Sequence, residues 1–479
     1  MTLKKILELL NSSEKKTAFL LLILTLFMAF LDMLGVASIM PFVAVLANPE
    51  IIENNDILNY LFIKSSNLGV ENNNDFLFLL GISVFILLIV SITTRLITNY
   101  LQISFALMRE YSIGKKLVEG YLSQPYEWFI NKNSSELGKG VLSEVGLVIN
   151  GVLKPTIQLI TQSAVTFAIL LLLIFTDPKL AISIGFVLGF CYIVIYLFIK
   201  NTLSRIGNER IKANTERFRA TSEAFAASKE VKLAGLEKFY LNLFSKPART
   251  FASNQSLSQI ITQLPRYFIE GIAFGGMIIL VLILISRDGE LSEILPLIAL
   301  YALAGYRLIP ALQQIYAAKT TLRFNRPSLD KLYNDLISLK LDFEELSLED
   351  RITLNKSINL NNVNFKYQNS KSDSLKNINI SIPVFKKIGI VGSTGGGKTT
   401  MVDLILGLLD ARKGSLSVDG VTITNSNKHL WQKKIGYVPQ QIYLSDSTIK
   451  ENIAFGVEPA KINQQILEKS AKIAQIYDF

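Results

Sequence analysis

The sequence predicts a multi-domain membrane protein in which a six-helix all-α transmembrane domain is followed by an α/β domain. Half of the 479 residues are hydrophobic and only 18% are charged, which is too apolar for an ordinary soluble protein. The apolar residues are concentrated before about Ala318, and a glycine-rich segment lies in the more polar remainder. We therefore expect a transmembrane domain over residues 1–330, a linker over 331–351 and the α/β domain over 352–479.

Six apolar runs are long enough to cross a bilayer, whose core of about 30 Å requires about 20 mostly apolar residues per helix. Charged residues interrupt three of the runs: Asp32 in the first, Glu270 in the fifth, and Glu293 with Arg307 in the sixth. The predicted spans are residues 17–47, 76–94, 155–176, 180–199, 267–286 and 291–318.

The charges between the runs predict the orientation of the spans. Four lysines precede the first run, and two long basic loops follow the second and fourth runs, so these segments are expected in the cytoplasm. The acidic loop 48–75 and the short turn 177–179 are expected outside. Because the basic loops contain helical patterns and few turn signals, we expect them to continue the membrane helices into the cytoplasm.

The net charge of +10 does not require a nucleic-acid partner, because membrane proteins collect Lys and Arg in their cytoplasmic loops. No nucleic acid is therefore predicted as a partner. Cys191 is the single cysteine, which excludes a disulfide framework within the chain.

The glycine-rich segment has the spacing Gly-x-x-x-x-Gly-Lys-Thr of a phosphate-binding P-loop. A predicted strand at 387–391 precedes it and a predicted helix at 401–409 follows it, which disfavours a chance glycine-rich turn. In such a loop the backbone N–H groups surround a phosphate, the lysine contacts the outer phosphates and the threonine ligates Mg²⁺. The predicted ATP-binding residues of the loop are Gly392, Ser393, Thr394, Gly395, Gly396, Gly397, Lys398, Thr399 and Thr400.

With these motifs the chain resembles the ATP-binding-cassette (ABC) exporters. Tyr367 lies at the position before the loop where this family places an aromatic residue that stacks on adenine, although packing is the alternative role. The segment 436–440 looks like the family's glutamine loop, which implies that Gln440 joins Thr399 at Mg²⁺ and reaches the attacking water. The segment 447–453 also fits the exporter branch. Asp419-Gly420 is independently a two-residue hairpin signal between predicted strands.

Several family motifs do not occur before Phe479: the Leu-Ser-Gly-Gly-Gln signature, the strand that ends in Asp-Glu (Walker B) and the switch histidine. His429 precedes the glutamine loop and does not match the switch position. We therefore expect an incomplete, C-terminally truncated P-loop ATP-binding domain with no catalytic residue of its own. The full-length protein is expected to be an ATPase, and the chain as printed to be inactive.

The membrane region looks more specifically like the lipid-linked oligosaccharide flippases of bacterial protein glycosylation. The residues that carry this resemblance are 123–129, the acidic outer loop and 264–270, and the run 57–62 matches an external helix of that family. The resemblance implies ATP-driven flipping of a polyprenyl-pyrophosphate glycan by a homodimer. It also implies a multi-pass protein among the lipids of the bacterial inner membrane, with the N-terminus and the ATP-binding domain in the cytoplasm.

Three arginines are candidates for substrate binding: Arg95, Arg266 and Arg307. Guanidinium groups bind phosphates bidentately, and arginines at matching positions of the flippases contact the pyrophosphate. Snorkelling to the membrane boundary is the alternative for Arg95 and Arg266.

Two other functions remain open from the sequence. One is a multidrug, peptide or lipid exporter on the same scaffold. The other, from a different class, is a truncated and non-catalytic ATP-binding regulatory subunit.

Overall fold

The computed structural model describes residues 2–132, 134–285, 291–339, 352–368, 370, 372–440 and 442–478. The chain forms two compact units, Met1–Glu344 and Glu345–Phe479. The division between them falls inside the predicted linker 331–351.

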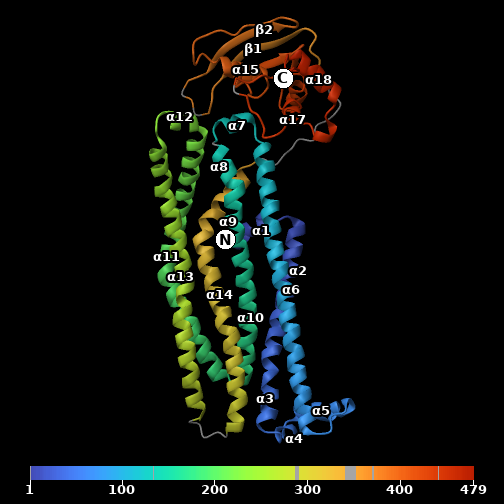
Figure 1. Cartoon of the computed structure of the whole chain (residues 1–479), viewed down its shortest axis with the longest axis vertical. Helices are drawn as coiled ribbons and strands as arrows, with labels where there is room; N and C mark the ends of the chain where they lie inside the picture. The colour runs from blue at the N-terminus through green and yellow to red at the C-terminus, as the bar shows by residue number, and fades with distance from the viewer. Residues whose placement is uncertain are drawn as a thin grey trace. The chain divides into compact units, whose positions relative to one another are not determined.

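The first unit is helical, and four of its helices have 48 to 50 residues (Figure 1). At 1.5 Å per residue, a 50-residue helix is about 75 Å long, far more than a bilayer core requires. The prediction that the basic loops continue the membrane helices is confirmed. The α-helices are α1 (Thr2–Leu9), α2 (Ser12–Ala37), α3 (Ile39–Ala47), α4 (Ile51–Asn54), α5 (Asp56–Ser65), α6 (Asn73–Leu122), α7 (Tyr126–Ile130), α8 (Ser134–Lys139), α9 (Val145–Val148), α10 (Lys154–Thr176), α11 (Pro178–Ala226), α12 (Ser228–Leu233), α13 (Glu237–Ile285) and α14 (Leu291–Ser338). A 3₁₀ turn, η1 (Ser66–Leu68), and two π-helical turns, η2 (Gly140–Glu144) and η3 (Ile149–Leu153), complete the unit.

Within the described residues, five helical segments are long and apolar enough to cross a membrane: Ser12–Ala47, Asn73–Leu122, Glu136–Thr176, Pro178–Ala226 and Leu295–Ser338. Four of the six predicted spans lie wholly within these segments, and a fifth, 291–318, does so from residue 295 onward. The remaining predicted span, 267–286, falls on α13. Several side chains of that part of α13, and residue 286 itself, lie outside the described residues.

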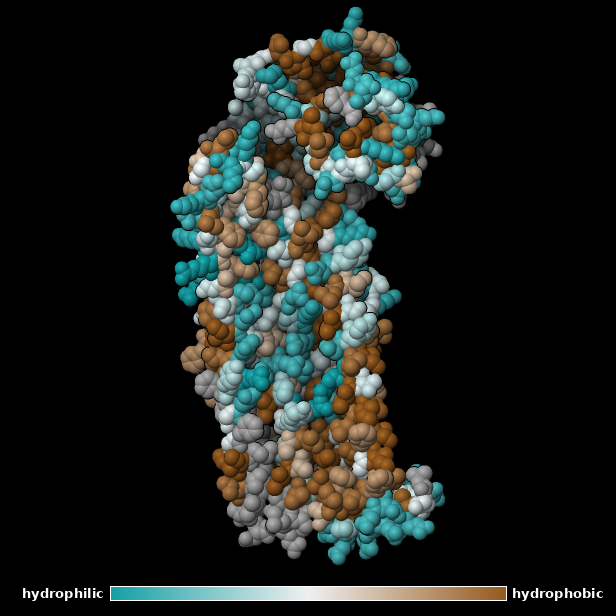
Figure 2. Space-filling model, viewed as in Figure 1, coloured by the Kyte–Doolittle hydropathy of each residue, from teal (hydrophilic) through white to brown (hydrophobic). Residues whose placement is uncertain are grey.

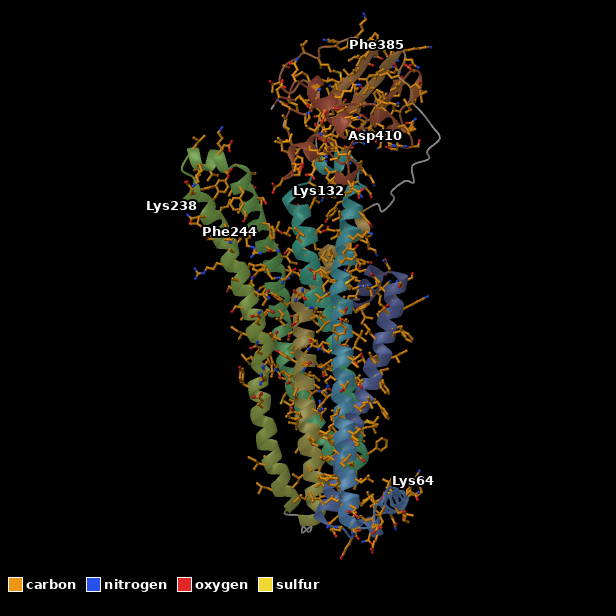
Figure 3. The ribbon with its side chains drawn as sticks, turned by 45° about the vertical axis from the view of Figure 1, so that its right-hand side comes forward. Lys64, Lys132, Lys238, Phe244, Phe385 and Asp410 are labelled. Atoms are coloured by element: carbon orange, nitrogen blue, oxygen red, sulfur yellow. The ribbon has the colours of Figure 1, made fainter. Side chains whose placement is uncertain are left out.

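The ends of the helical unit agree with the expected loops. Asp177 lies between α10 and α11 and its carboxylate accepts the N–H groups of Lys179 and Leu180 at 3.0 and 3.1 Å, which makes a tight turn. The predicted helix at 57–62 forms as part of α5. Figure 3 places Lys64, in the last turn of α5, at one end of the unit, and Lys132 and Lys238 at the other.

One core cluster of the helical unit lies between α2, α10 and α14, where Met28, Val165 and Leu300 are buried. Farther along α14, this helix crosses α11 closely at Gly207. A Cβ atom on Gly207 would lie 2.3 Å from the carbonyl oxygen of Phe324, so only glycine fits there. Figure 2 shows hydrophobic residues over much of the surface of this unit, as expected of helices that face lipid.

The second unit contains a four-stranded antiparallel sheet of order β2-β1-β3-β4. Buried residues of β1, β3 and α15, among them Val363, Phe365, Leu404 and Val418, form its core. Its elements are β1 (Ser357–Phe365), β2 (Leu375–Pro383), α15 (Lys398–Ile405), β3 (Lys413–Val418), β4 (Val421–Thr422), α16 (Lys428–Gln432), α17 (Ile449–Ile453), the 3₁₀ turn η4 (Pro459–Lys461) and α18 (Gln464–Ile473).

The hairpin prediction is confirmed, because Val418 of β3 pairs with Val421 of β4 around Asp419 and Gly420. Both turn residues have positive φ, 50° and 89°, as this type of tight turn requires. The predicted helix at 401–409 forms as α15, but it begins three residues earlier and ends at Ile405.

The predicted strand at 387–391 is wrong, because these residues form no regular structure. Apolar character alone does not make a strand, since a strand exists by pairing with a neighbour. The described strands pair only with one another, and none lies along 387–391. Val391 is accordingly 93% exposed.

Candidate functional site

The glycine-rich loop is shaped by two residues with positive φ. Gly395 and Gly397 both have φ of +81°, a conformation that other residues rarely adopt. A Cβ atom on Gly397 would lie 2.7 Å from the side chain of Leu375 and 2.8 Å from the carbonyl oxygen of Ser374. Gly397 is therefore required both for the turn and for the close approach to the start of β2. It is also the N-cap of α15.

Lys398 is the first residue of α15 and its ammonium lies over the loop. The Nζ atom donates to the carbonyl oxygens of Gly392 and Ser393, both at 2.8 Å. Residues 392–396 are exposed, and the N-terminus of α15 favours negative charge beside them. The loop, the ammonium and the helix end thus form an arrangement suited to polyphosphate.

Tyr367 is tied to the first turn of this helix. Its hydroxyl lies 3.1 Å from Oγ1 of Thr400, which is buried, and its ring makes an edge contact with Phe365, the centroids being 4.9 Å apart. Tyr367 also lines a pocket of about 740 Å³ together with Asp373 and Arg412. The structure therefore brings the candidate adenine-stacking residue to the P-loop helix.

Gln440 is not joined to this arrangement. It is exposed, in a segment without helix or strand, and no hydrogen bond links it to Thr399 in the described part of the chain. Thr399 is also exposed, on the first turn of α15. The two proposed Mg²⁺ ligands, Thr399 and Gln440, are thus not brought into contact in the described part of the chain.

Two buried residues beside the loop, Asp403 on α15 and Trp431 on α16, were missed by the sequence analysis. Burial raises the pKa of the Asp403 carboxyl. The indole N–H of Trp431 donates to the carbonyl oxygen of Ile405 at 2.7 Å, which satisfies the C-terminal end of α15. An acid inside a short apolar helix was the signal that could have identified Asp403.

The helical unit contains a cavity of about 780 Å³ between α2, α6, α10 and α14. Figure 2 shows hydrophilic residues along the middle of the visible face of this unit, bordered by hydrophobic ones. The charged residues that line the cavity are Asp32, Arg95, Lys154 and Arg307. Its uncharged polar residues are Thr98, Asn99, Gln102, Gln158, Thr161, Gln162, Tyr306 and Gln314.

The structure separates the three candidate arginines. Arg95 forms an ion pair with Asp32, whereas Arg307 lines the same cavity with no carboxylate within 4 Å among the described residues. Arg266 is not a lining residue: it is exposed on α13 and pairs with Glu270 at 2.8 Å. From the sequence, Asp32 and Glu270 could be recognised as charged residues inside predicted spans. Their ion-pair partners, Arg95 and Arg266, could not.

The glutamines of the cavity were also missed, although the signal was present. Gln158 and Gln162 are one helical turn apart within the apolar run 155–176, and therefore lie on one face of α10.

Comparison with known proteins identifies the class to which this fold and loop belong. Residues 18–303 match the family described as the ABC transporter transmembrane region, and residues 375–478 match the family described as ABC transporter. The chain belongs to the ABC transporter family. It is a multi-pass membrane protein that carries one transmembrane and one ATP-binding domain.

Individual relatives agree with this assignment. A putative multidrug export ATP-binding/permease protein of Staphylococcus aureus is 26% identical over 402 residues, 84% of this chain and 69% of that protein. The uncharacterized ABC transporter ATP-binding protein YfiB of Bacillus subtilis is 35% identical over 28% of this chain. The transport/processing ATP-binding protein ComA of Streptococcus pneumoniae is 26% identical over 49% of it. The matches cover only 23% of YfiB and 31% of ComA.

A solved structure shows the same fold. It is described as a bacterial Atm1-family ABC exporter with ATP bound, and it superposes with a TM-score of 0.70 at 16% identity. The superposition covers 98% of this chain and 78% of that one. The ABC exporter fold expected from the sequence is therefore confirmed.

Proposed function

We propose that this chain is a half-transporter that works as a homodimer in the bacterial inner membrane and uses ATP to flip a polyprenyl-pyrophosphate oligosaccharide. The observation that carries the substrate assignment is Arg307, a guanidinium inside a membrane helix that lines a cavity and has no described carboxylate partner. Such a charge is costly in a bilayer unless it faces a cavity or an anionic partner. We further propose that α13 supplies the fifth of the six spans and that the N-terminus and the ATP-binding domain are cytoplasmic.

ATP hydrolysis is assigned to the glycine-rich loop. Its N–H groups and Lys398 would hold the phosphates, and the hydroxyl of Thr399, together with Gln440, would ligate Mg²⁺. Bound Mg²⁺ neutralises the charge that develops on the transferring phosphoryl group.

The ATP assignment is tested with Lys398→Ala in the reconstituted full-length transporter. Loss of a positive charge that stabilises the transition state should lower the hydrolysis rate at least about a hundredfold. Lys434→Ala is the matched control, because Lys434 is an exposed lysine of the same unit that lies outside the loop. Normal turnover by the Lys398 variant would refute the role of the loop.

The pyrophosphate is assigned to Arg307 first and to Arg95 second. Arg95 already shares its charge with Asp32, so Arg307 has the guanidinium that remains available to an anion. A guanidinium contacts two phosphate oxygens at once, which a lysine ammonium does not reproduce. Arg266 stays a third candidate, outside the cavity.

The substrate assignment is tested by flipping of the pyrophosphate-linked glycan by the full-length transporter in vesicles. Arg307→Ala should reduce the rate at least about tenfold, since a charge-assisted hydrogen bond contributes about 1.5–3 kcal/mol. Arg307→Lys should recover only part of the rate. Arg249→Ala, an exposed arginine on α13, is the control, and Arg266→Ala is measured beside it. Wild-type flipping by Arg307→Ala would refute the head-group assignment and leave the family assignment unaffected.

A second candidate function is export of apolar drugs. It is favoured by the Staphylococcus aureus relative, which is named a putative multidrug exporter, and by the apolar residues Met28, Ile92 and Val165 of the cavity. Stimulation of ATP hydrolysis by drugs but not by the pyrophosphate-linked glycan would favour this candidate.

A further inference from the structure

A row of uncharged amide side chains lines the cavity next to the arginines. The Nε2 atoms of Gln158 and Gln162, on α10, donate to Oε1 of Gln314, on α14, at 3.0 and 2.8 Å. On α6, Nε2 of Gln102 donates to the hydroxyls of Thr25 and Thr161, both at 2.9 Å. These side chains thus form two linked groups that connect α2, α6, α10 and α14.

The glutamines of α6 and α14 follow the arginines of the same helices along the cavity. Gln102 lies seven residues after Arg95 on α6, and Gln314 lies seven residues after Arg307 on α14. Seven residues are two helical turns, about 10 Å along the axis, so each pair lies on one face of its helix. All four residues line the same cavity. The amides therefore extend the arginine site along the cavity.

Several hydrogen-bond donors and acceptors of these glutamines make no hydrogen bond within the row. Gln314 accepts two donors through Oε1, and its own Nε2 has no protein acceptor among the described residues. The Oε1 atoms of Gln102, Gln158 and Gln162 likewise accept no described donor. An amide carries two donor hydrogens and an oxygen with two lone pairs, so these lining residues retain both donors and acceptors that no described protein group uses.

The charge of the lining differs along the cavity. Arg95 and Arg307 lie at one end of the row and Lys154 lies near Gln158, while the row itself carries no charge. An anion is favoured by the arginines, whereas neutral amides that offer both donors and acceptors suit hydroxyl groups. A purely apolar cargo would leave these amides desolvated and unpaired, at a free-energy cost.

We propose that Gln102, Gln158, Gln162 and Gln314 form a carbohydrate subsite that binds the first sugars of the substrate while Arg307 binds its pyrophosphate. The link to a pyrophosphate rests on the function proposed above, but the sugar subsite does not depend on it.

The test is equilibrium binding to the protein in lipid nanodiscs with three probes. The first is a polyprenyl-pyrophosphate oligosaccharide, the second an isoprenyl pyrophosphate without sugar, and the third an alkyl oligosaccharide without phosphate. The variant is the triple substitution Gln158→Leu, Gln162→Leu and Gln314→Leu, which keeps the side-chain volume and removes the amides. Gln263→Leu on α13 is the control, because Gln263 is exposed and does not line the cavity.

The triple variant should bind both sugar-bearing probes at least about tenfold more weakly than the wild type, since it loses the hydrogen bonds of three amides to the sugar. Its affinity for the sugar-free pyrophosphate should change less than about twofold. Gln158→Leu alone guards against misfolding of the triple variant, because Gln158 is exposed, and should weaken the sugar-bearing probes about threefold.

Two results would overturn the subsite: equal affinity of the wild type for the first two probes, or unchanged sugar binding by the folded triple variant. Failure of the pyrophosphate assignment is distinguishable. In that case Arg307→Ala binds the first two probes normally, while the triple variant still loses the alkyl oligosaccharide.

Discussion

Arg95 on α6 forms an ion pair with Asp32 on α2, and the hydroxyl of Ser91 donates to the same carboxylate at 2.5 Å. The side chain of Asp32 is 0% exposed and that of Arg95 is 40% exposed. A carboxylate inside an apolar run is tolerated here because a cation and a hydroxyl both satisfy it. The pair joins two membrane helices, and Arg307 lies in the same cavity without a carboxylate partner among the described residues.

Removing one partner of this pair should destabilise the helical unit. Arg95→Ala leaves the buried Asp32 carboxylate without its cation, and we expect a loss of about 2 kcal/mol. This is less than the 3–5 kcal/mol of a fully buried pair, because Arg95 is partly solvated. Thermal unfolding in a fixed detergent measures the change. The double variant Arg95→Ala/Asp32→Asn should recover part of the loss, and equal melting temperatures for wild type and Arg95→Ala would contradict the role of the pair.

Tyr367 should contribute to ATP binding through its ring rather than its hydroxyl. Stacking of a base on an aromatic side chain contributes about 1–3 kcal/mol, so Tyr367→Ala should weaken ATP binding about tenfold. Tyr367→Phe loses only the contact with Thr400 and should remain within about threefold of the wild type. Fluorescent-nucleotide titration measures both, with Tyr477→Ala as control. If the phenylalanine variant binds as weakly as the alanine variant, Tyr367 acts through Thr400 instead.

Gly207 should not tolerate a methyl group. In Gly207→Ala the new Cβ atom would lie 2.3 Å from the backbone oxygen of Phe324, so α11 and α14 must move apart, at a cost of about 1–3 kcal/mol. Gly189→Ala on the same helix is the matched control, because its Cβ atom would meet nothing within 4 Å. Removing glycine from a helix interior should leave that variant equal to the wild type or slightly more stable. The comparison is of melting temperatures, and equal values for the two variants would show that the crossing is looser than described.

Asp419 should make the hairpin of β3 and β4 sensitive to acid. Its carboxylate accepts the N–H groups of Asn355, Lys356 and Ser357 at 2.5, 2.8 and 2.9 Å, and these hydrogen bonds hold its pKa below the ordinary value. A carboxyl whose pKa is lowered by folding stabilises the fold above its unfolded pKa, about 3.9, and loses this contribution as the pH falls through the folded pKa.

Protection of the amides of residues 355–357 from hydrogen exchange should therefore be constant near neutral pH and decline below about pH 4. Asp419→Asn should remove this pH dependence, and Asp410→Asn, at an exposed aspartate of the same unit, should leave it intact. Protection that persists in acid would show that the carboxylate does not hold this segment.

The features that were predicted correctly from the sequence are local ones. The apolar runs, the long helices, the Asp419-Gly420 hairpin and the glycine-rich loop are each specified by neighbouring residues, through propensity, period or turn geometry. The candidate residues Lys398 and Tyr367 could likewise be named, because a motif has fixed spacing. The strand at 387–391 failed for the opposite reason, since its formation depends on a partner and not on its own composition.

The sequence by itself determined the class of protein, the positions of the long apolar helices and the position of the glycine-rich loop. Only the tertiary structure decided which charges are paired and which line the cavity. Asp32 and Arg95 are 63 positions apart, and Gln162 and Gln314 are 152 apart. No periodicity extends over such separations, because the packing of α2, α6, α10 and α14 brings these side chains together. The same packing leaves Arg266 outside the cavity and Arg307 within it.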